Sequence, residues 1–175
     1  MCLRFAPLVV LAILTAGCFQ NEGYQKTLEI RSVFENGGEI PKKYTCDGKD
    51  VSPPLFIENI GSNVKSLVIV CEDPDAPMGV FTHWIAWNVE VTNKIPENIP
   101  KVKEVGEPVK MVQGKNDFGR IGYNGPCPPS GKHRYYFKVY ALDTVLDGDF
   151  DREELLKAIE GHVVQYGEIY GVYSR

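Results

Sequence analysis

Basic residues are in the minority in this chain. It carries 19 Lys and Arg against 23 Asp and Glu over 175 residues, a formal net charge of −4. This balance excludes a basic nucleic-acid footprint and gives no polybasic patch for an anionic membrane. The sequence also lacks a G-x-S-x-G nucleophile elbow, an H-E-x-x-H metal motif, paired-cysteine metal spacings and nucleotide-binding motifs. We therefore expect no enzyme activity, no metal and no cofactor.

The composition is that of one globular, β-rich domain. Hydrophobic residues make up 43% of the chain and charged residues 24%, which argues against disorder. The 9 Tyr and 8 Phe favour strands. The 17 Gly and 12 Pro predict many turns and leave little room for long helices.

The N-terminal segment predicts export. Residues 5–14 read FAPLVVLAIL, which is shorter than the roughly 20 apolar residues that cross a bilayer. A charged start, a short apolar run and small residues at 15–17 are typical of a signal peptide. Cys18 follows directly, and the segment resembles a lipobox. We predict a signal peptide over residues 1–17, a tether over 18–27 and one domain over 28–175.

On this interpretation Cys18 is the first mature residue and carries a lipid, which makes the protein an exported, membrane-anchored lipoprotein. The alternative is a plain signal peptide with an incidental Cys18, which gives a secreted protein.

Strand and helix patterns divide the domain into a mostly β body and a late helix. Alternating or continuous apolar runs predict strands at residues 28–34, 66–71, 84–91 and 135–142, the second of them buried on both faces. Residues 95–130 are a long, weakly patterned stretch. Asp151 with Glu154 predicts a capped helix whose apolar face runs to Val163 and which stops at Gly167. A sandwich or barrel fits this order.

Three cysteines remain if Cys18 is lipidated and Cys2 leaves with the signal peptide. An exported compartment permits one internal disulfide and one spare thiol, and the spacing alone leaves the pair open. Cys71 ends an apolar run, whereas Cys46 and Cys127 lie in loops rich in Gly and Pro. We predict a bond between Cys46 and Cys127 if those two loops meet.

Polar chemistry gathers in two clusters. The first is DPDAP at residues 73–77, directly after the apolar run, with His83 opening the next strand. The second is the loop of residues 116–135, which delivers His133, Arg134 and Tyr135 to the head of a strand. Each cluster alone also fits a rigid turn with solvated side chains.

Together with YTCDGKDVSPPL at residues 44–55, these motifs resemble the phosphatidylethanolamine-binding protein family, in particular its prokaryotic, Raf-kinase-inhibitor-like branch. The resemblance covers residues 28–175, and the ending at residues 160–175 is similar to that branch's final helix. It implies an antiparallel Greek-key β-sandwich with a few peripheral helices, one of them near the C-terminus. It also implies a small pocket for phosphate, phosphorylated head groups or similar ions. His162 would lie on the late helix, structural or exposed.

The resemblance implies a set of ligand-binding residues. Phe81 would replace an aromatic wall that eukaryotic members build from a Trp, and Cys127 leaves two prolines as candidates for one position. The implied residues are Asp73, His83, Gly125, Pro126, Pro128 or Pro129, His133, Arg134 and Tyr135.

We therefore expect a non-enzymatic module that binds a small anion or phosphorylated ligand, since imidazoles, a Tyr hydroxyl and loop N–H groups can all donate to an anion. The alternative is an inhibitor or regulator of a protein partner. The family includes protease and kinase inhibitors, and an exported location favours a protease.

The lipid on Cys18 is directly testable. A two-chain lipid anchors a protein firmly, whereas one short chain does so only marginally. We expect the protein in the membrane fraction and the Cys18→Ser variant in the soluble fraction. An unmodified Cys18 in the intact mass of the mature protein would contradict this.

Overall fold

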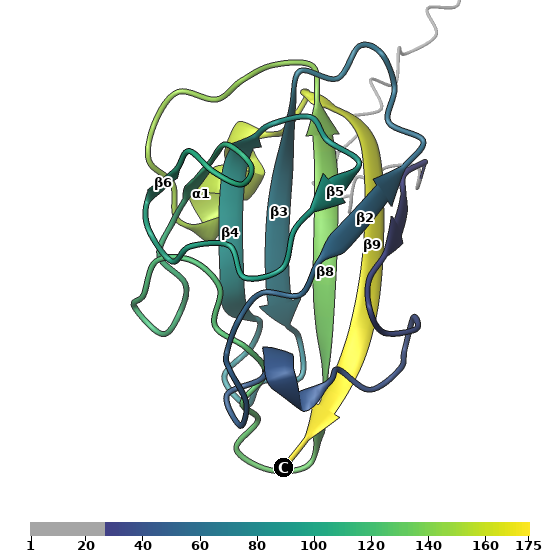
Figure 1. Ribbon diagram of the computed structural model, residues 1–175. Helices are drawn as coiled ribbons and strands as arrows, with labels where there is room; N and C mark the ends of the chain where they lie inside the picture. The colour runs from purple at the N-terminus through teal and green to yellow at the C-terminus, as the bar shows by residue number, and fades with distance from the viewer. Residues whose placement is uncertain (1–26) are drawn as a thin grey trace, which may run out of the picture.

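The computed structural model describes residues 27–175 (Figure 1). The predicted signal peptide, Cys18 and most of the tether lie outside the described residues. Within residues 27–175 no helix is both long and apolar enough to cross a membrane.

Two antiparallel sheets face each other, with the small sheet in front of the large one in Figure 1. The large sheet has the spatial order β6 (Glu104–Val105), β7 (Met111–Gln113), β4 (Phe81–Val89), β3 (Ser66–Asp73), β8 (Lys132–Leu142) and β9 (Val163–Ser174). The small sheet has the order β1 (Glu29–Arg31), β2 (Leu55–Glu58) and β5 (Lys94–Ile95). A 3-10 turn, η1 (Lys42–Tyr44), and one helix, α1 (Arg152–Ala158), complete the described elements.

Strand β3 is the centre of the fold, and every one of its residues is buried. Because successive side chains of a strand point to opposite faces, Leu67 and Ile69 pack against the small sheet, whereas Val68 and Val70 pack against α1. This explains why residues 66–71 read as a continuous apolar run, and it confirms a strand that is buried on both faces.

The strand order confirms the antiparallel sandwich. β8 returns from a long connection to lie beside β3, which gives the order β8-β3-β4-β7 of a Greek key. The stretch at residues 95–130, expected as one loop, holds the short strands β6 and β7 and begins at the end of β5. Strands of two and three residues are too short to show an alternating pattern in the sequence.

The C-terminal segment corrects one expectation. Asp151 and Glu154 form the predicted capping box, but α1 ends at Ala158. Residues 163–174 form β9 and not a continued helix, because their side chains alternate and pair with β8. His162 therefore lies in the turn between α1 and β9, half exposed and hydrogen-bonded to Asp143.

Glycine explains how β9 fits against the body. A Cβ at Gly167 would lie 2.5 Å from the Leu28 carbonyl oxygen, and one at Gly171 would lie 2.4 Å from Cγ1 of Ile40. Both positions let the N-terminal segment approach the sheet closely. Gly167 is thus a site of close packing in a strand, not the end of a helix.

Buried charge ties α1 to the sheet. Glu72 of β3 is buried and forms ion pairs with Lys138 of β8 and Arg152 of α1. The Nε and Nη2 atoms of Arg152 lie 2.8 Å and 2.6 Å from Oε2 of Glu72. The carboxylate is therefore matched by two cations on the helix side of the large sheet.

Candidate functional site

The predicted polar residues meet at one end of the large sheet. Since β4 and β8 both run antiparallel to β3, their first residues lie beside the last residues of β3. Asp73 ends β3, His83 lies near the start of β4, and His133 lies near the start of β8. The hairpin of β3 and β4 and the distant strand β8 thereby place their side chains around one space.

That space is a pocket of about 280 Å³. Its polar groups come from Asp73, His83 and His133, and the remaining wall is apolar. The apolar lining consists of Ala76, Pro77, Met78, Phe81, Phe118, Cys127, Pro128 and Pro129. In the described part of the chain, no three His, Cys, Asp or Glu side chains are grouped so as to hold a metal ion.

His133 is oriented by a buried carboxylate. Its Nδ1 lies 2.7 Å from Oδ2 of Asp73, and both side chains are nearly inaccessible. Oδ1 of Asp73 accepts the backbone N–H of Asp75 at 2.8 Å, which fixes the carboxylate in the turn after β3. With Nδ1 held by Asp73, Nε2 is the ring nitrogen that remains for a ligand.

His83 is held by a backbone carbonyl. Its Nδ1 lies 2.7 Å from the carbonyl oxygen of Asn124, which can only accept, so Nδ1 carries the proton. Burial lowers the pKa of His83, although the Asn124 carbonyl and the charge of Asp73 oppose that shift. Nε2 of His83 therefore accepts when the ring is neutral and donates once it is protonated.

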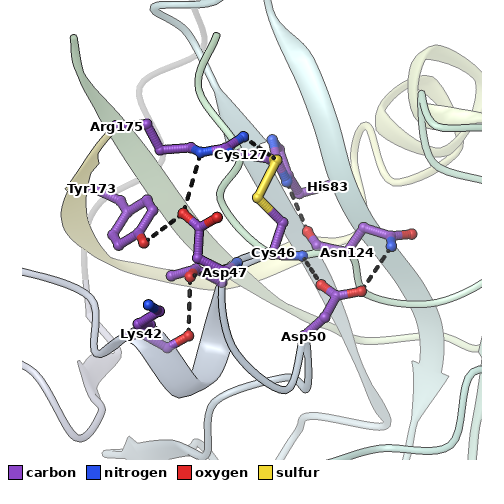
Figure 2. Close-up of a disulfide and its surroundings, with 11 residues drawn as sticks. Lys42, Cys46, Asp47, Asp50, His83, Asn124, Cys127, Tyr173 and Arg175 are labelled. Atoms are coloured by element: carbon purple, nitrogen blue, oxygen red, sulfur yellow. Dashed lines mark hydrogen bonds and ion pairs between the residues drawn. A yellow bond between two sulfur atoms is a disulfide. The ribbon is translucent and has the colours of Figure 1, made fainter. Parts of the chain in front are cut away.

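The carbonyl of Asn124 is itself held in place by residues that the sequence motifs contain but the sequence reasoning missed. Asp50 accepts the Gly125 N–H at 2.6 Å and the Asn124 side-chain amide at 3.1 Å. Asn116 donates to the Asn124 side-chain oxygen at 2.8 Å. Figure 2 shows this chain running from Asp50 through Asn124 to His83. Asp50 lies within the motif YTCDGKDVSPPL, so membership of that motif was the signal that could have indicated its role.

Tyr135 packs against both imidazoles. Its ring contacts His83 edge-on at 5.2 Å between centroids and stacks on His133 at 6.5 Å. Burial, then the charge of Asp73, raises the pKa of Tyr135, so its hydroxyl keeps its proton. Among the residues that the structure describes, this hydroxyl is the one buried side-chain polar atom without a hydrogen-bond partner. Tyr135 is fully buried and does not line the pocket, so the structure places this predicted ligand residue beside the two imidazoles, with its hydroxyl near Asp73.

Aromatic rings form one side of the pocket. Phe81, His83 and Phe118 contact one another edge-on, with centroids 4.9 to 5.5 Å apart. Phe81 stands where the family resemblance implied an aromatic substitute. Phe118, from the loop before β8, was not predicted, since nothing in its sequence surroundings distinguishes it from an exposed loop residue.

Within residues 125–129, some residues line the pocket and others hold the segment in place. Pro128 and Pro129 both line the pocket, so the two candidates act together. Gly125 and Pro126 do not line it. A Cβ at Gly125 would lie 2.3 Å from the Tyr44 carbonyl oxygen, and the Pro126 carbonyl accepts the N–H of Cys46 at 3.1 Å. These two residues fix the segment against the loop after η1.

Arg134 lies outside the pocket, because it falls between two inward-facing residues of β8. Its guanidinium forms a two-point ion pair with Asp75, with distances of 2.8 Å and 2.6 Å. Arg134 holds the pKa of Asp75 near 2, below its ordinary range. The structure thus places this predicted ligand residue on the surface, where it braces the DPDAP turn.

A disulfide joins Cys46 to Cys127, with the Cα atoms 5.5 Å apart, and Cys71 is buried and free. Because Cys127 lines the pocket, the bond fastens the pocket wall to the loop after η1. Figure 2 shows Arg175 beside Cys127, with Asp47 between Arg175 and Tyr173.

The fold and the pocket define a β-sandwich with a ligand-sized site at one sheet end. A family model described as phosphatidylethanolamine-binding protein matches residues 30–174, and the chain belongs to this family. It is 68% identical over 168 residues to a UPF0098 protein of Archaeoglobus fulgidus, covering 96% of this chain and 58% of that relative. It is 58% identical over 172 residues to a UPF0098 protein of Pyrococcus horikoshii, covering 96% and 87%. The chain thus spans little more than half of the first relative.

Solved structures show the same fold. One, described as a phosphatidylethanolamine-binding protein homologue of Chlamydia trachomatis, superposes with a TM-score of 0.77 at 40% identity, over 86% of this chain and 99% of that one. YbcL of Escherichia coli superposes with a TM-score of 0.76 at 28% identity, over 85% and 99%. Both are prokaryotic members of the family.

Removing the disulfide should weaken the fold. A cross-link between positions 81 apart restricts the unfolded chain by about 4 kcal/mol. We expect Cys46→Ser/Cys127→Ser to lower the free energy of unfolding by that order in urea denaturation. Thiol counting on the denatured, unreduced mature domain should find Cys71 alone free. Three free thiols would contradict the pairing.

Proposed function

We propose that the pocket at the ends of β3, β4 and β8 binds a small anion or phosphorylated ligand of the phospholipid head-group type, without catalysing a reaction. The observation that carries this proposal is the pair of buried imidazoles, His83 and His133, which line one small pocket and are each held at Nδ1 by an acceptor of the protein. Hydrogen-bond donors gathered in a site of low polarity favour an anion.

Charge balance supports one negative charge in the ligand. Asp73 would repel an anion, but its carboxylate is hydrogen-bonded to His133. His83 adds a positive charge when it takes up a proton. A phosphodiester, which carries a single negative charge, therefore suits the site better than a dianion.

The pocket's size and walls support a small head group. About 280 Å³ is at the lower end of ligand sites, and the walls around the polar groups are mostly apolar. The family description and the name of one structural relative both refer to phosphatidylethanolamine binding, which agrees with a head-group ligand.

The predicted lipid on Cys18 would hold this pocket near a membrane surface. The predicted tether of residues 18–27 would separate the anchor from the first strand, and its composition is polar. In this proposal the ligand is a membrane component or a small molecule of the exported space.

Affinity should depend on pH through His83. Glycerophosphoethanolamine keeps its phosphodiester charge from pH 8 to pH 6, so titration calorimetry with it reports the protein's own groups. Because burial lowers the pKa of His83 and a bound anion raises it again, affinity should rise as the pH falls. His83→Ala should weaken binding about tenfold to a hundredfold at pH 6, the loss of one charge-assisted hydrogen bond, and flatten the pH dependence, and His133→Ala should also weaken binding.

His162→Ala is the matched control for these variants, since it removes an imidazole that lies outside the pocket, in the turn between α1 and β9. Its affinity should match that of the unaltered protein. Unchanged affinity and pH dependence in the His83 and His133 variants would refute the pocket assignment. Inhibition of a protease by those variants would instead favour the alternative of a protein regulator.

Tyr135→Phe separates ligand binding from packing. The substitution keeps the ring contacts with both imidazoles and removes only the hydroxyl. Affinity for glycerophosphoethanolamine should fall several-fold, whereas the free energy of unfolding should stay constant or rise by about 1 kcal/mol, because an unpaired buried donor is removed. Calorimetry and urea denaturation measure the two effects. A loss of stability with unchanged affinity would show that the hydroxyl serves the apo fold.

A further inference from the structure

Cys127 is part of both the pocket wall and the disulfide bond. Its side chain lines the pocket, and its sulfur is bonded to Cys46 of the loop after η1. Pro128 and Pro129, which follow it, continue the same wall. Any chemistry at this bond therefore acts directly on the pocket.

The two sulfurs differ in their surroundings. Cys46 is an exposed residue, whereas Cys127 is half-buried and Cys71 is fully buried. Thiol–disulfide exchange requires a thiolate to reach one sulfur in line with the bond. The loop side, at Cys46, is the accessible side for that attack.

The charged residues around the disulfide also favour attack on Cys46, with Cys127 as the leaving group. Nη1 of Arg175 lies 3.4 Å from Sγ of Cys127. Nε of Arg175 lies 3.2 Å from the Asp47 carboxylate, which also accepts the Tyr173 hydroxyl at 2.8 Å. The carboxylate next to Cys46 is thus matched by two donors, and the guanidinium stays beside Cys127. A cation next to a sulfur stabilises its thiolate, which makes that sulfur the better leaving group.

We propose that the Cys46–Cys127 bond is a thiol–disulfide exchange site at which an external dithiol, attacking Cys46, releases the pocket wall. A thiolate of the dithiol bonds to Sγ of Cys46, and the disulfide's electron pair leaves on Cys127 as a thiolate beside Arg175. The second thiol of the dithiol loses its proton and displaces Cys46, which takes that proton up, and the Cys127 thiolate takes up the proton that the first thiol had lost. The protein's disulfide is reduced to two thiols and the dithiol is oxidised to a disulfide.

Release would loosen the wall without unfolding the sandwich. After cleavage, the hydrogen bonds from Cys46 N–H to Pro126 and from Gly125 N–H to Asp50 still hold the start of the segment. Residues 127–129 lie beyond these bonds. Ligand affinity is then lower in the reduced protein, a consequence that rests on the function proposed above.

The direction of attack is tested on the native mature protein with glutathione, a monothiol, followed by alkylation and peptide mapping. We expect glutathione on Cys46, the alkyl group on Cys127 and an unmodified Cys71. Glutathione on Cys127, or no reaction until denaturant is added, would overturn the exchange site.

Arg175 provides a matched pair of variants for the leaving-group step. Arg175→Gln should slow reduction by dithiothreitol roughly threefold to tenfold, and Arg175→Lys, which keeps a cation, should restore most of the rate. Equal rates in all three proteins would overturn the role of Arg175. Circular dichroism of each variant before reduction shows that the compared proteins share one fold.

Calorimetry with glycerophosphoethanolamine then tests the effect on the pocket. We expect the reduced protein, and the folded Cys46→Ser/Cys127→Ser variant, to bind at least tenfold more weakly than the oxidised protein. Equal affinity would overturn the release of the wall. If the oxidised protein binds no ligand, the proposed function fails, whereas the peptide map still decides the exchange site.

Discussion

The antiparallel pairing of β3 with both β4 and β8 is the constraint on which the site depends. Strand β3 is buried on both faces, so its register with each neighbour is fixed by two cores at once. A slip of one residue on β8 would turn His133 away from the pocket and bring Arg134 toward it. The same packing that stabilises the sandwich therefore determines which side chains of the HRY sequence can meet a ligand.

Two neighbouring carboxylates on β3 have different roles, because they point to opposite faces of the sheet. Glu72 points toward α1 and is matched by Lys138 and Arg152. Asp73 points toward the pocket, where it orients the ring of His133. One carboxylate thus ties the helix to the sheet, and its neighbour positions a residue that lines the pocket.

Those parts of the site that short-range sequence patterns determine could be predicted from the sequence. His83 and His133 open strands after rigid loops, and the apolar run before Asp73 marks a buried strand, so these positions were predictable. Arg134 was assigned to the pocket because it belongs to a recognised motif, but strand alternation places it outside. Asp50 was missed because it acts through a side-chain amide and a backbone N–H that lie 74 and 75 residues away. The helix was predicted to continue past Val163 because Val163 and three apolar residues before it recur at helical spacing.

The disulfide and the two prolines of the pocket wall have a consequence for the thermodynamics of recognition. A proline has a fixed φ and a cross-linked loop has few alternative conformations, so the wall is ordered before any ligand arrives. Ligand binding then requires little loss of conformational entropy from this segment. As long as the bond is intact, each binding event depends mainly on the hydrogen bonds and desolvation of the ligand itself.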